Sequence, residues 1–251
     1  MELNVEEKGT PICIIKNAPD KKTPVIYLEK EGERARFPFQ ELSLDKDQYF
    51  QVIPDPTIER NVIYLTGQSG SGKSYWIKLY CKEYAKMYPK RDIFVFSSLQ
   101  EDKSLDDIKK LKRIKLSEQL LQEQITSEDF KDSLVIFDDC DVITSKPMKN
   151  KVISIMNSIL ETGRHWRTSI CVVSHLACKG NETKTVLNEC QSIVIFPKSI
   201  GAGNLKYLLN NYSSLDKEQQ KKLKHVKSRW ICIRKTYPNV IISEKEIFVS
   251  N

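Results

Sequence analysis

The sequence predicts an α/β fold with a mainly parallel sheet that is covered by helices on both faces. Two observations support this fold class. The apolar runs at residues 61–66 and 133–137 lack the polar alternation of a half-exposed strand, as expected for strands buried on both faces. Segments with helical spacing separate such runs along most of the chain, which is the order of elements in a parallel sheet.

The first 57 residues carry three short apolar runs, at 12–15, 25–28 and 35–39, and each is predicted to be a strand. Pro38 confines the third run to a sheet edge, because proline has no N–H to donate to a ladder. Pro54 and Pro56 then interrupt the chain, and we place a boundary near residue 58. The sequence therefore divides into a short-strand segment at 1–57 and a larger domain at 58–251.

The larger domain alternates strands with helices. Strands are predicted at 61–66, 92–97, 114–116, 133–137, 168–174 and 191–196, and helices at 73–87, 104–111 and 147–162. Gly163 stands where a helix C-cap is expected. A helical region rich in Leu and Lys at 205–226 precedes two strands, at 229–234 and 240–243, which we expect to form a C-terminal hairpin.

Composition limits the class of protein. Among the 251 residues there are 40 Lys+Arg and 33 Asp+Glu. The balance is uneven, because residues 1–60 carry 9 basic and 12 acidic side chains and residues 61–251 carry 31 and 21. The basic excess fits either a solvated surface or a polyanionic partner. No apolar run approaches the roughly 18 residues of a membrane span, and the acidic start is not a secretory signal.

The seven cysteines are odd in number and contain no CxxC pair, which favours reduced thiols in a cytosol-like compartment. Cys171, His175, Cys178 and Cys190 lack the ligand spacing of a zinc site, so buried thiols are the preferred interpretation.

One segment fits the phosphate-loop motif GxxxxGK[ST] at every fixed position, between a buried strand and a helix. Its residues are Gly67, Gln68, Ser69, Gly70, Ser71, Gly72, Lys73 and Ser74. The glycines let successive backbone N–H groups converge on an anion, and the helix N-terminus adds positive partial charge. We expect Lys73 to reach the β- and γ-phosphates of a nucleotide and the Ser74 hydroxyl to bind Mg²⁺.

The apolar run at 133–137 ends in two acids, Asp138 and Asp139, at the sheet edge where ligands collect in open α/β folds. We expect Asp138 to hold the magnesium shell, and Asp139 to polarise the attacking water. A second acid at this place favours hydrolysis over transfer to a small acceptor.

Polar residues also flank the strand at 168–174. His175 follows its end, where a side chain can touch a γ-phosphate or the attacking water, although a structural histidine would fit as well. Arg164 and Arg167 lie at the opposite end, far from their own phosphate loop. They are either surface charges or, in a ring, a trans-acting finger for the neighbouring site, with Arg164 preferred.

Over about residues 58–200 the sequence resembles one family in the order of four motifs. The motifs are the phosphate loop, LVIFDD, the GRHxxxS stretch at 163–169 and the SH at a strand end. That family is the poxvirus-type genome-packaging ATPase of large DNA viruses, virophages and Polinton-like elements, within the FtsK/HerA group. The resemblance implies a RecA-like P-loop ATPase fold, ring assembly, ATP and Mg²⁺ as cofactors, and translocation of double-stranded DNA into a capsid. It implies a Walker B pair at Asp138 and Asp139, although FtsK/HerA enzymes often have Glu at the second position, and a polar sensor at His175. A capsid protein is the expected partner, and the host cytoplasm, a viral factory or the virion is the expected location.

The C-terminal region is rich in lysine. Lys217, Lys221, Lys222, Lys224 and Lys227 are candidates for neutralising DNA phosphates without reading sequence, and a solvated amphipathic helix is the alternative. At the level of function, two alternatives to a DNA-translocating ATPase remain open, namely a P-loop phosphotransferase and a nucleotide-gated binding module with little turnover.

Overall fold

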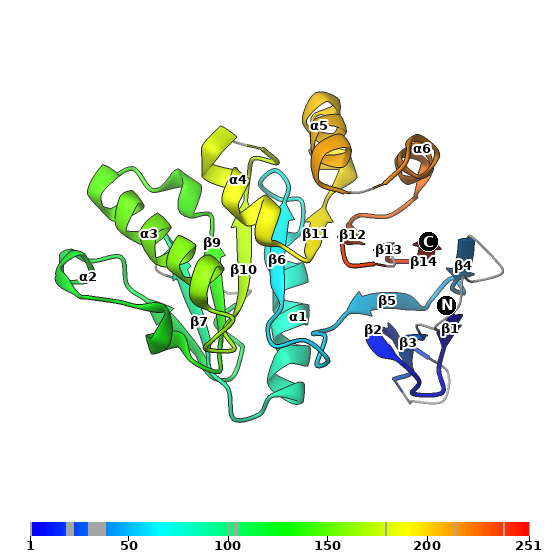
Figure 1. Ribbon diagram of the computed structural model, residues 1–251, viewed down its shortest axis with the longest axis horizontal. Coiled ribbons are helices and arrows are strands. Elements are labelled where there is room, and N and C mark those ends of the chain that lie inside the picture. Colours follow the sequence, from blue (N-terminus) through cyan, green and yellow to red (C-terminus); the bar gives the residue numbers. More distant parts are fainter. Residues whose placement is uncertain are drawn as a thin grey trace.

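The computed structural model describes residues 2–18, 23–29, 39–99, 101–102, 105–178, 180–213, 215–237 and 239–250. In these residues ten strands form one sheet (Figure 1). Six neighbouring strands are parallel, in the order β8 (Leu111–Ile114), β7 (Ile93–Ser97), β9 (Leu134–Asp138), β10 (Ser169–Ser174), β6 (Val62–Thr66) and β11 (Ser192–Ile195). The sheet continues in antiparallel fashion through β12 (Ile231–Arg234), β13 (Asn239–Ser243), β14 (Glu246–Ser250) and β4 (Phe39–Ser43).

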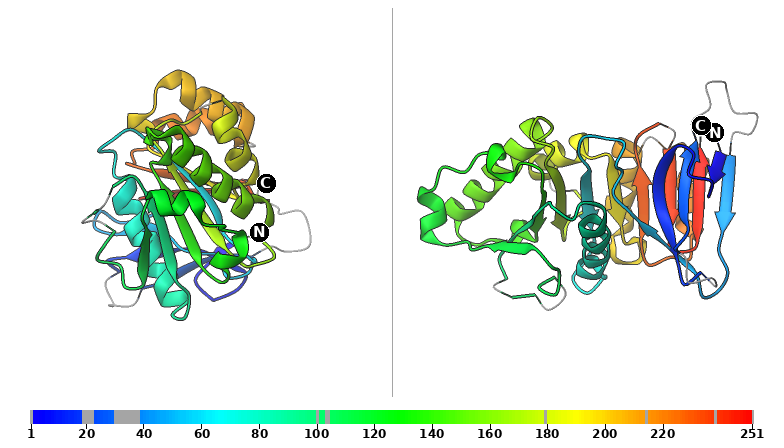
Figure 2. Two further views of the ribbon diagram at one scale, coloured as in Figure 1. Left: turned by 90° about the vertical axis from the view of Figure 1, so that its left-hand side faces the viewer. Right: turned by 90° about the horizontal axis from the view of Figure 1, so that it is seen from below.

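Helices cover both faces of the parallel strands (Figure 2). Along β6, Val62 and Tyr64 face a hydrophobic cluster that includes α3 (Lys146–Thr162) and α4 (Gly180–Glu189). The alternate residues Ile63 and Leu65 face a second cluster with α1 (Lys73–Met87). The strands read as continuous apolar runs because both of their faces are buried. The predicted α/β class, with a mainly parallel sheet and a C-terminal hairpin of β12 and β13, is confirmed.

The N-terminal part of the described chain forms a second, antiparallel sheet of four strands. Their order is β1 (Glu2–Asn4), β3 (Val25–Glu29), β2 (Thr10–Lys16) and β5 (Tyr49–Val52). The strands predicted at 12–15 and 25–28 are confirmed as parts of β2 and β3. The run predicted at 35–39 lies outside the described residues except for Phe39, which begins β4. Phe50 of β5 and Trp76 of α1 belong to the same hydrophobic cluster, so this sheet packs on the α1 side. The division near residue 58 stays a prediction.

Two predicted helices differ from the structure. The expected helix at 104–111 is wrong, because the described residues from Leu105 form isolated turns, with Lys110 in the left-handed region (φ 69°). β8 therefore begins earlier than the strand predicted at 114–116. The helical region at 205–226 is two helices, α5 (Ala202–Tyr212) and α6 (Lys217–His225). α6 starts anew because the Asp216 side chain accepts a hydrogen bond from the Gln219 N–H (2.8 Å), which caps its N-terminus.

Shorter helical segments complete the described chain, and none of them was predicted. They are α2 (Glu118–Gln122) and three 3₁₀ turns, η1 (Ser127–Phe130), η2 (Cys140–Val142) and η3 (Pro197–Ser199). In the described part of the chain, no helix combines the length and the apolar character that crossing a membrane requires.

Gly163 ends α3 as predicted, but for a different reason than the usual left-handed cap. Its φ is −61°, which other residues tolerate. The Arg60 guanidinium donates hydrogen bonds to the carbonyl oxygens of Ile159 (2.5 Å) and Leu160 (2.6 Å), satisfying the end of the helix. A Cβ at position 163 would lie 2.9 Å from Arg60 Nη1 and 2.5 Å from the Ile159 oxygen. Glycine is needed there because of this close approach.

Candidate active site

The phosphate loop joins the end of β6 to the start of α1. Gly70 (φ 75°) and Gly72 (φ 109°) are both left-handed, a conformation that glycine adopts without strain. Gly72 immediately precedes the helix, so the loop's N–H groups lie at the positive end of α1. The loop predicted from the motif therefore has the backbone that phosphate binding needs.

The carboxyl ends of three parallel strands meet at this loop. Thr66 at the end of β6 lies opposite Ser174 at the end of β10, and Val173 lies opposite Asp138 of β9. The Gly67 N–H donates to the Ser174 carbonyl (3.3 Å), which ties the loop to the neighbouring strand. Strand register thus brings the phosphate loop, the acidic pair and His175 to one edge of the sheet.

Lys73 is buried and turned toward the loop's own backbone. Its Nζ donates to the carbonyl oxygens of Gly67 (2.8 Å) and Gln68 (3.2 Å) and lies 3.1 Å from His175 Nδ1. Burial lowers the pKa of Lys73, while the nearby carboxylates, Asp139 first, oppose that shift. A phosphate oxygen would compete for the same ammonium protons.

His175 connects Lys73 to the acidic pair. An ammonium has three protons and no acceptor, and the three contacts of Lys73 Nζ use all of them. Nδ1 of His175 therefore accepts, and its remaining proton sits on Nε2, which is 2.9 Å from Asp139 Oδ2. The result is a continuous hydrogen-bonded path from the phosphate-loop lysine through His175 to Asp139.

The two acids differ in their surroundings. Asp138 is 4% exposed, and burial followed by the charge of Asp139 raises its pKa to about 7. Asp139 is half-buried, and its pKa is also raised by burial, against the lowering effect of Lys73. Its backbone is left-handed (φ 49°), and Oδ1 is buried without a hydrogen-bond partner among the described residues. A non-glycine residue in this conformation stores backbone strain at the site.

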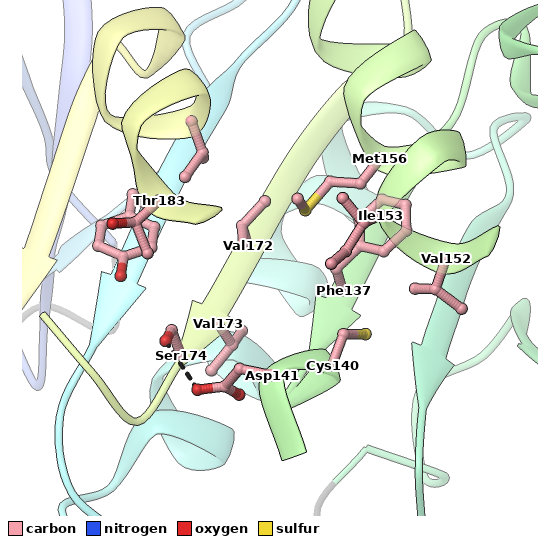
Figure 3. A pocket seen from close by; sticks show the side chains of 12 residues that line it. Phe137, Cys140, Asp141, Val152, Ile153, Met156, Val172, Val173, Ser174 and Thr183 are labelled. Atoms are coloured by element: carbon pink, nitrogen blue, oxygen red, sulfur yellow. Dashed lines mark hydrogen bonds between the residues drawn. The ribbon is translucent and has the colours of Figure 1, made fainter. Parts of the chain in front are cut away.

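A third acid, Asp141, was not predicted from the sequence. The Ser174 hydroxyl lies 3.1 Å from Oδ2 of Asp141 (Figure 3). Oδ1 of Asp141 is buried and has no partner in the described chain. Both residues line a mostly apolar cavity of about 510 Å³ beneath α3 and α4 (Figure 3). The only sequence signal was a further acid in DDCD, which is indistinguishable from a solvated turn.

These residues fit a magnesium ion that comes with a nucleotide. Ser74 stands at the first turn of α1 and is partly exposed, and the Asp138 carboxylate ends β9 at the same edge of the sheet. Hard oxygen ligands of this kind suit Mg²⁺, which takes its remaining ligands from phosphates and water. Among the described residues, no group of three or more His, Cys, Asp or Glu side chains could hold a metal by itself.

The two arginines of the 163–169 stretch lie away from this edge, before the start of β10. The Arg164 side chain is 72% exposed and bonds through Nε to the Glu59 carboxylate. Arg167 donates to Asp132 (2.8 Å). Neither arginine reaches the phosphate loop of its own chain, so a role for Arg164 in trans stays a prediction.

A different arginine lies against the phosphate loop. A Cβ at Gly72 would lie 3.0 Å from Nη2 of Arg229, in the segment that leads into β12. In the sequence, Arg229 is only one of many basic residues near the C-terminus. Its position could not be predicted, because it depends on the antiparallel pairing of β12 with β11.

The proposed DNA-contacting lysines lie on and after α6. Lys217, Lys221, Lys222 and Lys227 are exposed or partly exposed, and Lys222 Nζ lies 4.4 Å from the centre of the Phe248 ring. The side chain of Lys224 lies outside the described part of the structure. Their role in DNA binding stays a prediction.

Comparisons with known proteins support the fold and identify the family. No protein-family model matches the sequence. The chain is 39% identical over 245 residues to the "Uncharacterized protein V3" of Sputnik virophage, covering 96% of both chains. The structure resembles the genome packaging NTPase B204 of Sulfolobus turreted icosahedral virus 2 in complex with ATP-gammaS (TM-score 0.50, 16% identity, 74% of this chain and 97% of that one).

It also resembles the cytoplasmic domain of the type VII secretion ATPase EccC of Thermomonospora curvata (TM-score 0.53, 13% identity, 82% of this chain and 28% of that one). At these identities the likeness concerns the fold, and the P-loop ATPase fold expected from the motifs is confirmed. The chain thus belongs to the same family as protein V3 of Sputnik virophage and has the fold of the P-loop ATPases.

Proposed function

We propose that this protein hydrolyses ATP to move double-stranded DNA, and that the DNA is a viral genome packaged into a preformed capsid. The observation that carries the hydrolytic part is the path from Lys73 through His175 to Asp139. It connects a γ-phosphate ligand to a carboxylate that has a free buried oxygen, Oδ1, among the described residues. A P-loop fold that only gates binding has no need of this connection.

In the proposed mechanism, the phosphate loop and Lys73 bind the triphosphate, and Asp139 accepts the proton of the attacking water. His175 holds Asp139 through its Nε2 proton and contacts Lys73 through Nδ1, so the lysine and the base are positioned together. Ser74 and Asp138 would hold Mg²⁺, which when bound offsets the negative charge of the phosphates. A bound cation would also favour ionised Asp138, whose burial otherwise disfavours its charge.

The packaging part of the proposal rests on charge and on the relatives. Residues 61–251 carry 31 basic and 21 acidic side chains, and exposed lysines lie along α6. A basic surface without a base-reading motif suits sequence-independent contact with DNA phosphates. The family includes a virophage protein, and B204 with the same fold is a genome packaging NTPase. We infer a homo-oligomeric ring completed by Arg164, a capsid protein as partner, and action in the host cytoplasm or viral factory, or on the virion.

The test is phosphate release from ATP, measured with and without linear double-stranded DNA of several kilobases. We expect magnesium-dependent hydrolysis that long DNA stimulates, and DNA of unrelated sequence should stimulate equally. A rate that depends on a small phosphate acceptor would identify a phosphotransferase instead. A low rate that neither DNA nor acceptors change would contradict the motor and favour a nucleotide-gated binding module.

A further inference from the structure

Beside the phosphate loop lies a hollow of about 480 Å³ that the hydrolytic residues do not use. Its lining includes Tyr49 of β5, Gly72 and Tyr75 at the start of α1, Phe196 after β11, and Arg229 before β12. Segments far apart in the sequence meet here, because β5 of the N-terminal sheet packs against α1 (Figure 1).

Strand order fixes the direction in which a nucleotide would lie. β6 carries the phosphate loop, with β10 and β9 on one side and β11 and β12 on the other. Asp138, Asp139 and His175 follow β9 and β10, whereas Phe196 and Arg229 adjoin β11 and β12. A triphosphate with its γ end at the carboxylates therefore has its nucleoside end on the β11 side, which is the side of the hollow.

The lining has the chemistry of a nucleoside site. Tyr75 follows Ser74 directly, and its large side chain is 55% exposed, so its ring is accessible to a ligand beside the phosphate loop. Tyr49 lies close enough that burial and the Tyr75 phenol together raise its pKa. Aromatic faces stack on nucleobases with little dependence on sequence or base identity.

Polar groups of the lining are also left unused. Gln51 Nε2 donates to the Leu79 carbonyl (2.9 Å), which fixes the amide orientation, and its buried Oε1 has no partner among the described residues. The same holds for the Tyr80 hydroxyl. The Arg229 guanidinium lies beside Gly72, and the Glu244 carboxylate in the same lining accepts the Arg229 backbone N–H (2.8 Å). Buried polar atoms without partners are costly unless a ligand satisfies them.

We propose that this hollow holds the nucleoside of ATP, with the base against Tyr75 and Tyr49 and with Arg229 on the nucleoside end of the phosphate chain. The inference rests on the proposed function and adds that the N-terminal sheet, through β5, forms one wall of the nucleotide site. It accounts for a segment to which the sequence motifs assigned no role.

The experiment compares two ligands by calorimetry in the presence of Mg²⁺, ATP and inorganic tripolyphosphate, which lacks a nucleoside. Tyr75→Ser should weaken ATP binding about tenfold, the loss expected for one stacking contact, and leave tripolyphosphate binding within about twofold of wild type. Arg229→Gln should weaken both ligands about tenfold, because both carry the phosphate chain. Tyr207→Ser is the matched control, since Tyr207 is 52% exposed but lies on α5, outside the lining of the hollow.

The outcomes separate the two proposals. Wild-type protein that binds neither ligand would overturn the proposed function and this inference together. Binding of both ligands that Lys73→Ala abolishes, with Tyr75→Ser binding ATP as wild type does, would uphold the phosphate site and overturn the nucleoside site. An equal loss of both ligands in Tyr75→Ser would also overturn it, because Tyr75 would then support the loop rather than the base. Unchanged binding of both ligands in Arg229→Gln would overturn the contact assigned to the arginine.

Discussion

The two sides of the phosphate loop are built differently. On the carboxylate side, defined by Asp138, Asp139 and His175, the side chains lie at the ends of two parallel strands, β10, which pairs with β6, and β9, which pairs with β10. On the hollow side, defined by Tyr49, Tyr75, Phe196 and Arg229, they come from the N-terminal sheet, from α1 and from strand ends in the antiparallel region. The hydrogen bonds of His175 tie the carboxylate side together. Both sides retain buried polar atoms without a partner in the described chain, such as Asp139 Oδ1 on the carboxylate side and Gln51 Oε1 on the hollow side.

We expect this difference to correspond to two roles, hydrolysis on the carboxylate side and nucleotide affinity on the hollow side. The carboxylate side is connected to the phosphate loop through His175, which contacts both Lys73 and Asp139. The hollow side has aromatic walls and an arginine, and its one acid among the described lining residues, Glu244, accepts the Arg229 backbone N–H (2.8 Å), so we expect it to affect affinity rather than bond breaking. Substitutions on the two sides should therefore change different kinetic constants.

The largest effect is expected from Lys73→Ala, because Lys73 contacts both the backbone of the phosphate loop and His175 on the carboxylate side. Phosphate release should fall below detection, and binding of ATP and tripolyphosphate should be abolished with it. Lys82→Ala, an exposed lysine on the same helix, is the control. A folded Lys73→Ala protein with wild-type turnover would show that this loop is not the active site.

The carboxylate side and the hollow side also differ in how well the sequence predicts them. The phosphate loop, Asp138 and Asp139 were predictable because each signal is local, a buried strand followed directly by the residues of the motif. Their proximity followed from the rule that parallel strands share a carboxyl edge. The position of Arg229 was not predictable, since it requires the pairing of β12 with β11, and no short motif encodes that pairing.

The fold shows the same limit. The ends of the buried parallel strands were predicted within one or two residues, because their continuous apolar runs must be buried on both faces of the sheet. In the segment at 104–111, which was predicted as a helix, Leu105, Ile108 and Leu111 have helical spacing. In the structure Leu105 and Ile108 are buried by separate turns, and Leu111 begins β8. Spacing alone does not distinguish these two solutions.

The second largest effect is expected from Arg164→Ala, which tests whether the carboxylate side is completed by a neighbouring subunit. Loss of a trans arginine typically costs roughly a thousandfold in rate. Mixing Arg164→Ala with Lys73→Ala should restore part of the DNA-stimulated activity, since some interfaces then combine an intact arginine with an intact loop. Glu59→Gln is the control, because it breaks the ion pair within the chain and keeps the arginine. Full activity of Arg164→Ala alone would show that Arg164 does not act on a neighbouring site, and that either Arg167 or no arginine of this stretch does so.

Third, Asp139→Asn should lower the turnover number about a hundredfold, the usual contribution of a general base, while ATP affinity stays within a few-fold of wild type. Asp138→Ala should instead weaken Mg-ATP binding. Single-turnover hydrolysis and equilibrium binding measure the two constants separately. The division of roles between the acids is wrong if both variants show the same binding defect and the same rate.

A smaller effect is expected for DNA binding at α6. Changing Lys217, Lys221 and Lys227 to Gln should reduce the slope of log affinity against log salt by about 0.9 for each DNA phosphate that the protein no longer neutralises. Lys90, Lys109 and Lys115 are exposed lysines near β7 and β8 and provide a matched triple control. Fluorescence anisotropy with a labelled duplex at several salt concentrations gives the slopes. An unchanged slope in the α6 variant would place the DNA path elsewhere, as would an equal change in the control.

The smallest effect concerns stability, and it tests the burial of Asp138 without nucleotide. The pKa of Asp138 in the folded protein is raised to about 7, above its usual value, so between these values the folded state binds more protons than the unfolded state. The free energy of unfolding therefore falls as the pH rises through this window.

Asp138→Asn removes the buried charge and should raise the melting temperature at pH 8 by several degrees, corresponding to roughly 1–3 kcal/mol, with a smaller gain at pH 5. Thermal melts in a chelator measure this difference, and Asp132→Asn, at a more exposed acid before β9, should show no such growth with pH. If the gain at pH 8 does not exceed that at pH 5, Asp138 is ionised at little cost in the folded protein. Burial would then not raise its pKa, and the carboxylate side would not differ from the hollow side in this respect.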